Sequence, residues 1–483
     1  MNRLFALLIT IIGAIASFQP VDANDSLSER AASALKRSVE FYHGKVALHG
    51  GYVYRYSDDL VKREGEGKVE TEKVWVQPPG TPSVGMVYLE AYEFLGEGYL
   101  LRAARDAAEC LIQGQLRTGG WRESVEFDPA ERKKFAYRVE KPRDKQNNHT
   151  TFDDDKTQSA MRLLMWLDQV LKFKDEKLHE ASLFALDSVV KAQFPNGSWG
   201  QGCDSFPNPA DYPVKPASYP AEFVLREPSK KYWYFYTLND NAMADTIDAL
   251  LLATKIYGDA KYRNAAIKGG EFLILAQMPE PQPAWAQQYN WDMHPCWARK
   301  FEPASITGGE SQGAIRILLR LFVETGDKKF LAPIPKALDY LERSRLPNGQ
   351  MARFYELRTN KPLYFTKNYE LTYDDSDLPT HYGFKLDGKL DQLRREYDSV
   401  EKLTEKEFVA RREVKPSKPK SSASMEALVK KLIESLDDRG AWVEDGQLRY
   451  HGKGDPARRV IDSSTFIRIV GTLSRYLVAV RGL

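Results

Sequence analysis

The sequence has few cysteines, no excess of charge of one sign and no apolar run of membrane length. Its three cysteines, Cys110, Cys203 and Cys296, are widely spaced and form no C-x-x-C pair. This spacing indicates neither a zinc site nor a disulfide framework, and at most one disulfide is expected. Lys and Arg (69) nearly balance Asp and Glu (67), which argues against a nucleic-acid binder with a wholly basic surface.

The N-terminal residues have the charge and length of a secretory signal peptide. Arg3 precedes an apolar run at residues 4–15, which is too short to span a bilayer. Cleavage after Ala23 or near Ala16 would release the mature chain, and an uncleaved anchor is the alternative. We therefore expect residues 1–23 to be a signal peptide and the mature chain to be secreted or periplasmic, without a stable membrane span.

Alternating strand patterns are scarce in this chain, whereas helical periodicity is frequent. Apolar residues recur at three- and four-residue spacing in segments 100–112, 158–171, 242–254 and 314–322. Gly258 and Gly326 follow two helical stretches and indicate a helix stop before a partner helix.

A short motif, Q-x-x-x-G-x-W, recurs at the ends of helical segments. It occurs at residues 115–121 and 193–199, with weaker echoes at 277–285, 346–351 and 438–442. Repeats of this kind imply one supersecondary unit stacked several times. We therefore predict an all-α fold, an α/α toroid built as an incomplete barrel of paired helices. The glycine is expected to form a positive-φ turn and the tryptophan to plug the next helix pair.

Three stretches fall outside this helical rhythm. Insertions are expected at about 128–150 and about 201–236, and a flexible linker at about 412–424. Because the insertions lie next to the candidate chemistry, they favour long irregular loops over a cleft. We expect residues 24–483 to form a single catalytic domain.

Two acidic segments, 153–155 and 239–241, directly precede helical runs. Three consecutive acids repel one another unless a cation or hydrogen-bond donors compensate, and oxygen-rich loops suit Ca²⁺. On two inner helices of a toroid, Asp153 or Asp155 and Asp240 would share one end and could bind one cation. The alternative is a pair of helix N-termini, whose caps and dipoles favour such residues.

Residues 285–313 form a long segment with almost no apolar periodicity. They carry Arg299, Glu302 and Glu310 near a Gly-Gly turn, as catalytic loops on a rigid scaffold often do. The structural alternative is a salt bridge between Arg299 and Glu302 or Glu310. A second segment, 348–362, supplies Arg353 and Arg358, which could hold carboxylates bidentately or form loop-stabilising ion pairs.

Together these segments resemble the pectic acid lyases, calcium-dependent enzymes that cleave polygalacturonate by β-elimination. Residues 298–311 are similar to the family's A-R-A-Y-E-P-P-S-L-S-G-G-E-S, and residues 351–362 to W-A-R-F-Y-E-L-x-T-N-x-P. Residues 237–243 are similar to T-Y-N-D-N-A-M. Residues 151–157 are similar to T-I-D-N-D-A-T, with Asp154 in place of Asn and Lys156 in place of Ala. The similarity extends over about residues 85–385.

The resemblance implies a cofactor, Ca²⁺, and a set of site residues. These are Arg299 as Brønsted base; Asp153, Asp155 and Asp240 as metal ligands; and Arg353, Arg358, Tyr355, Asn239 and Glu310 as substrate contacts. An arginine base is chemically demanding, because the pKa of free arginine lies above about 12. The implied partner is an acidic polysaccharide, polygalacturonate or a related polyuronate, bound by a monomer without nucleic acid.

The chain departs from the family pattern at two further positions, and its insertion from Cys203 to Tyr236 replaces a much shorter connection. His381 stands where the family has a substrate-binding arginine, and Trp297 replaces a lysine. Two alternatives therefore stay open, a glycoside hydrolase with two carboxylates and a non-catalytic carbohydrate-binding protein. A terpene cyclase also shares the repeat motif, but a chain with 28% charged residues and an export signal would handle such a lipid poorly.

Overall fold

The computed structural model describes residues 26–221, 231–404, 407–408, 411 and 419–482. The expected signal peptide, residues 1–23, and the first part of the expected linker, 412–418, lie outside these ranges. Within them, no helix is long and apolar enough to cross a membrane.

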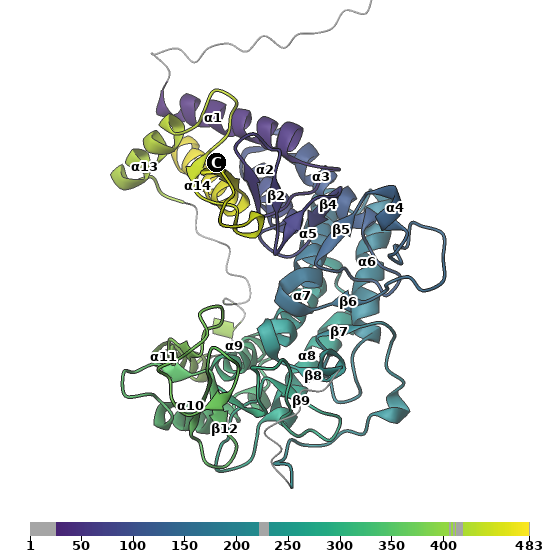
Figure 1. Ribbon diagram of the computed structural model, residues 1–483, viewed down its shortest axis with the longest axis vertical. Coiled ribbons are helices and arrows are strands. Elements are labelled where there is room, and N and C mark those ends of the chain that lie inside the picture. The colour runs from purple at the N-terminus through teal and green to yellow at the C-terminus, as the bar shows by residue number, and fades with distance from the viewer. Residues whose placement is uncertain (1–25, 222–230, 405–406, 409–410, 412–418, 483) are drawn as a thin grey trace, which may run out of the picture.

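The helices are arranged in two rows along an open arc (Figure 1). The first row runs in the order α14 (Ser463–Arg481), α2 (Thr81–Leu95), α5 (Lys156–Val170), α7 (Ala242–Tyr257) and α9 (Gly308–Thr325). Their second-row partners are α1 (Leu27–Phe41), α3 (Gly98–Gln113), α6 (Glu176–Lys191), α8 (Ala260–Ala276) and α10 (Ile334–Arg343). Two further helices, α11 (Leu390–Glu401) and α13 (Ala423–Glu434), lie at the two ends of the arc. This is the predicted α/α toroid, an incomplete barrel of paired helices.

The four helices predicted from apolar periodicity are present as α3, α5, α7 and α9. The two predicted stops are also present, because Gly258 and Gly326 cap α7 and α9 with left-handed φ of 70° and 74°. Apolar residues along these helices belong to one continuous core, which runs through both rows. Burial of one face against two neighbouring helices, rather than helix propensity, fixes their positions.

The repeated Q-x-x-x-G-x-W motif ties each helix pair together. The glycine has a positive φ, 94° at Gly119 and 96° at Gly197, as a tight turn requires. The buried tryptophan then donates from Nε1 to a carbonyl ten residues earlier, 2.7 Å for Trp121 and 2.8 Å for Trp199. The motif is therefore structural, as its predicted architectural role requires.

The glutamine of the same motif reaches the next pair of helices. Gln115 donates to the carbonyl of Ala181 at 3.0 Å, and Gln193 donates to that of Ala265 at 2.9 Å. Gln277 makes the corresponding bond to Pro333 at 2.8 Å. Each unit is thus bonded to its neighbour by a buried or half-buried side-chain amide.

We expect Trp199→Phe to lower the free energy of unfolding by about 1–3 kcal/mol, because it leaves the buried carbonyl of Val189 unpartnered. Denaturant unfolding measures this change. The matched control is Trp166→Phe, which removes an exposed bond to Glu93 and should cost less than about 1 kcal/mol. Equal losses in both variants would contradict the structural role of the motif.

Short strands connect the helices, although the sequence pattern predicted none. A five-stranded sheet has the order β16-β17-β1-β2-β3, a four-stranded sheet has the order β10-β12-β13-β14, and the other strands pair in twos. Each strand has two to four residues, which is too short for alternation to be visible in the sequence. The strands are β1 (Arg55–Ser57), β2 (Arg63–Glu64), β3 (Lys68–Val69), β4 (Lys73–Trp75), β5 (Ser124–Glu126), β6 (Thr150–Thr151), β7 (Gly202–Cys203), β8 (Tyr236–Thr237), β9 (Gln288–Tyr289), β10 (Ser305–Thr307), β11 (Met351–Ala352), β12 (Phe354–Glu356), β13 (Pro362–Phe365), β14 (Leu371–Thr372), β15 (Lys385–Leu386), β16 (Glu444–Asp445) and β17 (Arg459–Asp462).

The connections before α9 and after α10 share a second, smaller core of their own. It consists of seven buried residues from the loops and strands, separate from the main core: Trp297, Phe301, Phe354, Leu363, Tyr364, Phe365 and Phe384. We call it the loop core.

The three cysteines are free, so the structure contains no disulfide between them.

The insertion at 128–150 is bonded to the helical frame. It contains the short helix α4 (Pro129–Arg132), and Arg132 donates to the Gln113 carbonyl at the end of α3 at 2.7 Å. The described part of the second insertion begins at Gln201, whose side chain contacts the acidic residues discussed next.

Candidate active site

Two turns of the same conformation precede α5 and α7. In each, two consecutive residues are left-handed: Asp154 (φ 48°) and Asp155 (φ 60°) before α5, Asp240 (φ 48°) and Asn241 (φ 59°) before α7. Asp and Asn tolerate this region better than other non-glycine residues, which explains the composition of both segments. The turns lie side by side because α5 packs against α7.

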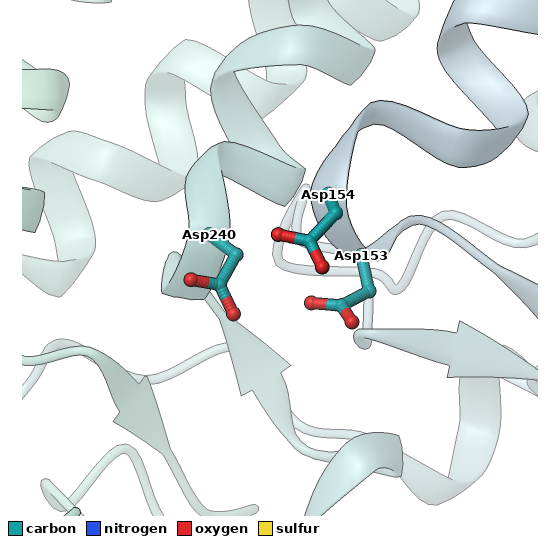
Figure 2. Close-up of side chains that lie close together, drawn as sticks. All are labelled: Asp153, Asp154 and Asp240. Carbon is teal, nitrogen blue, oxygen red and sulfur yellow. The ribbon is translucent and has the colours of Figure 1, made fainter. Parts of the chain in front are cut away.

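The two turns bring three carboxylates together, Asp153, Asp154 and Asp240 (Figure 2). One oxygen from each lies within 4.8 Å of the others. We call this group the acidic cluster. It confirms that the two acidic segments meet at one end of the toroid, but its membership differs from the prediction. Asp155 is not in it.

Asp155 instead forms an ion pair with Arg162 on α5. Asp154 and Asp155 are both left-handed, but Asp155 pairs with Arg162 whereas Asp154 joins Asp153 and Asp240, so the three consecutive acids do not form one group. Arg162 also donates to the Asp245 carbonyl at 3.2 Å on α7. Burial raises the pKa of Asp155, and Arg162 opposes this shift. Asp154, and not the predicted Asp155, thus shares the acidic cluster with Asp153 and Asp240.

The side chain of Lys156, for which the sequence predicted no role, places its positively charged ammonium inside the acidic cluster. Its Nζ donates to Asp153 at 3.0 Å and to Asp154 at 3.2 Å, and the residue is 5% exposed. Burial acts to lower the pKa of Lys156, but the two carboxylates outweigh burial and raise it. Burial likewise acts to raise the pKa of Asp153, but Lys156 and the amide of Gln201 at 2.7 Å lower it.

Asp240 remains poorly compensated. Burial, and then the charges of Asp153 and Asp154, raise the pKa of Asp240 to about 8. Its nearest cation is Arg299, whose Nη2 lies 3.6 Å from Asp240 Oδ2. A cation with oxygen ligands would relieve this excess of negative charge, and carboxylate oxygens are the ligands that Ca²⁺ prefers.

Arg299 is held by Glu302, which is 1% exposed. Its backbone N donates to Glu302 Oε2 at 3.1 Å and its Nε to the same oxygen at 2.7 Å, while Nη2 bonds to Oε1. Burial acts to lower the pKa of Arg299, but Glu302 and then Asp240 outweigh it and raise the pKa. The salt bridge that the sequence left open as the structural alternative is thus present.

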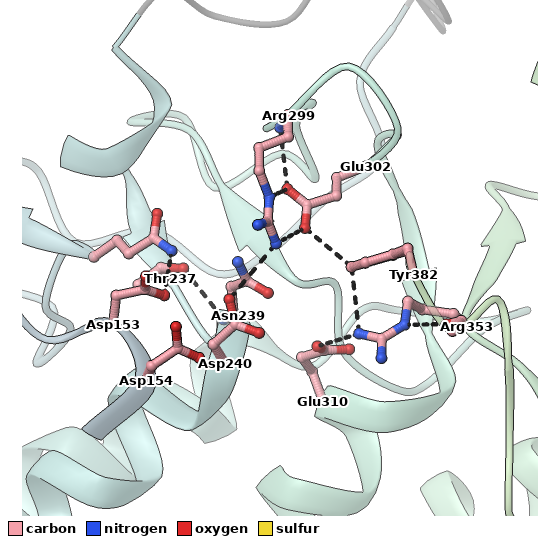
Figure 3. A network of polar contacts seen from close by, with 12 residues as sticks. Asp153, Asp154, Thr237, Asn239, Asp240, Arg299, Glu302, Glu310, Arg353 and Tyr382 are labelled. Carbon is pink, nitrogen blue, oxygen red and sulfur yellow. Dashed lines mark hydrogen bonds and ion pairs between the residues drawn. The ribbon is translucent and has the colours of Figure 1, made fainter. Parts of the chain in front are cut away.

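Tyr382 connects this ion pair to the second predicted arginine (Figure 3). Its hydroxyl donates to Glu302 at 3.0 Å and accepts from Arg353 Nη1 at 3.3 Å. Arg353 also lies 3.8 Å from Glu310 and donates to the Gly383 carbonyl at 2.6 Å. The acidic cluster, Arg299, Glu302, Tyr382, Arg353 and Glu310 form one continuous network, which we call the site network.

Two polar side chains of this region have unpartnered atoms although they are buried. Asn239 is 1% exposed, and in the described part of the chain neither its amide nitrogen nor its oxygen has a hydrogen-bond partner. Glu310 Oε2 is likewise unpartnered, with 8% of the side chain exposed. Buried groups of this kind are costly unless a ligand or water completes them. Both were predicted substrate contacts.

Tyr355 and Arg358, two other predicted substrate contacts, lie outside the site network. Tyr355 is 1% exposed, and its hydroxyl donates to the Ser344 carbonyl at 2.6 Å, so it closes a turn in the core. Arg358 donates to the Pro220 carbonyl at 3.0 Å and lies over the Tyr219 ring. It therefore fastens the second insertion to the frame. The shared motif places only Arg353 toward the other site residues.

The two departures from the family pattern occupy different surroundings. Trp297 is part of the loop core, and its Nε1 donates to the Arg299 carbonyl at 2.7 Å. His381 is exposed and lies beside Phe301 and Tyr369. Trp297 thus holds the backbone of Arg299 in place. The spacing of residues in the sequence gave no sign of this role.

Comparisons with known proteins agree with the motifs. The family model described as pectic acid lyase matches residues 115–322, and no curated protein sequence matches the chain significantly. A variant of the family 10 polysaccharide lyase from Cellvibrio cellulosa, in complex with trigalaturonic acid, is 19% identical with a TM-score of 0.46, covering 61% of this chain and 92% of that chain. A sugar epimerase from a ruminal bacterium is 12% identical with a TM-score of 0.45, covering 95% and 100%.

The family match spans both acidic turns, Arg299 and Glu310. Of the divergent positions, Asp154, Lys156 and Trp297 lie within it and His381 lies beyond it. By its motifs and by this match over residues 115–322, the chain is similar to the pectic acid lyase family, with divergent positions of its own.

Proposed function

We propose that this protein is an exported polysaccharide lyase that cleaves polygalacturonate or a related polyuronate by Ca²⁺-assisted β-elimination. The observation that carries the proposal is the site network, in which three clustered carboxylates adjoin two arginines. Export rests on the N-terminal signal pattern alone. The substrate class is supported by the family match, and the Cellvibrio relative binds trigalaturonic acid.

The acidic cluster fits a hard divalent cation. Its donors are carboxylate oxygens, and the neighbouring Asn239 has an unpartnered amide oxygen. Asp153, Asp154 and Asp240 would hold Ca²⁺, which would stabilise negative charge on the uronate carboxylate and so acidify the adjacent C5–H.

Elimination transfers the C5 proton to a base, forms the C4–C5 double bond and breaks the bond from C4 to the glycosidic oxygen. We assign the base to Arg299, as its motif implies. Because Glu302 favours the charged guanidinium, only a small neutral fraction is present near neutral pH. The rate should therefore rise with pH through the alkaline range.

Arg353 is assigned to substrate binding. Tyr382 and Glu310 orient its guanidinium from two sides, and a planar guanidinium pairs well with a carboxylate. We expect Arg353→Ala to raise KM on an anionic polymer more than it lowers kcat, the pattern of a lost uniform contact. Steady-state kinetics measures both constants. A fall in kcat at unchanged KM would place Arg353 in the transition state instead.

A non-catalytic carbohydrate-binding protein is the second candidate. The observation that favours it is the firm Arg299–Glu302 ion pair, which opposes proton abstraction. Such a protein would still bind polyuronates through Arg353 and the acidic cluster.

One assay separates the candidates. The purified protein is incubated with polygalacturonate, alginate and glucuronan, first with Ca²⁺ and then with a chelator, while ultraviolet absorbance is followed. Only β-elimination makes an unsaturated uronide, which absorbs. A hydrolase would release reducing ends without absorbance, and a binding protein would do neither while still retaining the polymer.

A further inference from the structure

The turns before α5 and α7 share one backbone conformation, but they differ in charge at the first residue of the helix. In each turn, the residue directly before the left-handed pair donates its backbone N–H to a threonine hydroxyl. Asp153 donates to Thr151 and Asn239 donates to Thr237, both at 3.2 Å. The residue directly after the left-handed pair is Lys156 in one turn and Ala242 in the other. Alanine therefore satisfies this helix start, and the lysine side chain is not needed for the turn.

The Lys156 ammonium lies where a cation would sit. It bonds to Asp153 Oδ2 and Asp154 Oδ2, in two of the three carboxylates of the acidic cluster. The residue is buried, so solvent screens its charge little. A divalent ion that binds the same carboxylates meets both the repulsion of this charge and the loss of its two hydrogen bonds.

An independent observation indicates that the cluster also receives a ligand. Asn239 adjoins Asp240, and both polar atoms of its buried side chain lack a partner within the described residues. Among the described residues, the Lys156 ammonium bonds to Asp153 and Asp154 and to neither Asn239 nor Asp240. The Asp240 side of the cluster thus faces Arg299 at 3.6 Å, while the single charge of Lys156 partly neutralises the other side.

We propose that the Lys156 ammonium competes with the divalent cation for Asp153 and Asp154 and thereby sets a low affinity for Ca²⁺ in this chain. The inference rests on the proposed function, because it takes the acidic cluster as the cation site of the lyase. Ca²⁺ binding displaces the ammonium from the two carboxylates. Without Ca²⁺, Lys156 keeps the cluster partly neutral.

The test is Ca²⁺ binding by isothermal titration calorimetry, without polysaccharide. Lys156→Met removes the charge and keeps an unbranched apolar stem, and Lys156→Ala reproduces the residue of the second turn. We expect both to bind Ca²⁺ with a Kd at least about tenfold lower than the wild type. Lys156→Arg, which keeps the charge, should bind no tighter than the wild type. Lys134→Met, at an exposed pair with Glu131, is the matched control and should leave the Kd unchanged.

Thermal unfolding provides a second readout that does not depend on calorimetric heat. In chelator, Lys156→Met should melt below the wild type, because three carboxylates then repel one another, and Ca²⁺ should restore its Tm. Adding Asp154→Asn to this variant should abolish the restoration and so locate the ion in the cluster.

Two results would overturn the inference: Ca²⁺ binding by Lys156→Met that is equal to or weaker than that of the wild type, or no binding by either protein. These outcomes are distinct from failure of the proposed function. A protein that releases no unsaturated product but shows tighter Ca²⁺ binding in Lys156→Met would refute the lyase and keep the competition.

Discussion

Replacing Arg299 with alanine is expected to lower turnover of polyuronate by about 10²–10⁴-fold, the contribution of a positioned general base. Folding should survive, because Arg299 is partly exposed and its partner Glu302 keeps a bond from the Tyr382 hydroxyl. The rate of unsaturated product formation measures the effect. Arg394→Ala, at an exposed ion pair with Asp339, is the matched control and should change little.

The pH dependence of the wild type separates a base from an ion pair at Arg299. The raised pKa of Arg299 means that its neutral form increases about tenfold for each unit of pH in the alkaline range. A base therefore gives a rising kcat/KM with unit slope until the fold fails. A residue that only neutralises the substrate carboxylate is already charged, so it gives no such rise, and Arg299→Lys would then retain most of the activity.

Replacing Asp240 with asparagine is expected to have opposite effects on activity and on stability. Turnover should fall at least about a hundredfold, because the acidic cluster loses a charge that would hold the cation. Stability in chelator should rise at alkaline pH, because the folded protein no longer contains a buried and poorly compensated carboxylate.

The sign of the stability effect follows from the pKa of Asp240, about 8 in the folded protein and about 3.9 in the unfolded chain. Between these values the folded state binds the proton more tightly, so the stabilisation is complete below about pH 4 and is lost as pH rises through about 8. In chelator, the wild-type Tm should fall relative to that of Asp240→Asn over this range. A constant difference in Tm would show that Asp240 is compensated in solution, and Ca²⁺ should raise the Tm of the wild type only.

The sequence predicted the frame of this protein well, because its signals are local. A glycine with a positive φ and a tryptophan ten residues from its acceptor carbonyl recur in three units, at 119/121, 197/199 and 440/442. The meeting of the two acidic segments was also predictable, since consecutive inner helices begin at the same end of a toroid.

The membership of the acidic cluster was not predictable from composition. The choice between Asp154 and Asp155 depends on which of two left-handed residues points inward, and a run of three acids gives no sign of this. Repetition offered one usable signal. When residues 151–156 are aligned with residues 237–242, Asp154 is paired with Asp240. The same alignment shows that Lys156 stands where the second turn has alanine.

Tyr382 was missed because it lies far along the chain from both arginines and follows the substituted His381. Its role depends on the strands that bring residue 382 beside Glu302. The confinement of Tyr355 to the core was also hidden. Residues two apart in a strand share a face, so the motif suggests that Tyr355 accompanies Arg353, but β12 begins only at Phe354, after Arg353.

The two halves of the site network, the acidic cluster and the residues around Arg299, pack on different cores, because the loop core is separate from the main core. The acidic cluster is attached to the first-row helices, whereas Arg299, Glu302 and Tyr382 are attached to strands and loops around Trp297 and Phe354. A small core of seven residues opens at lower free energy than a core that runs through the whole arc. The arginine half is therefore the part of the enzyme in which sequence drift can change what is bound, while the helical frame and its carboxylates keep their shape.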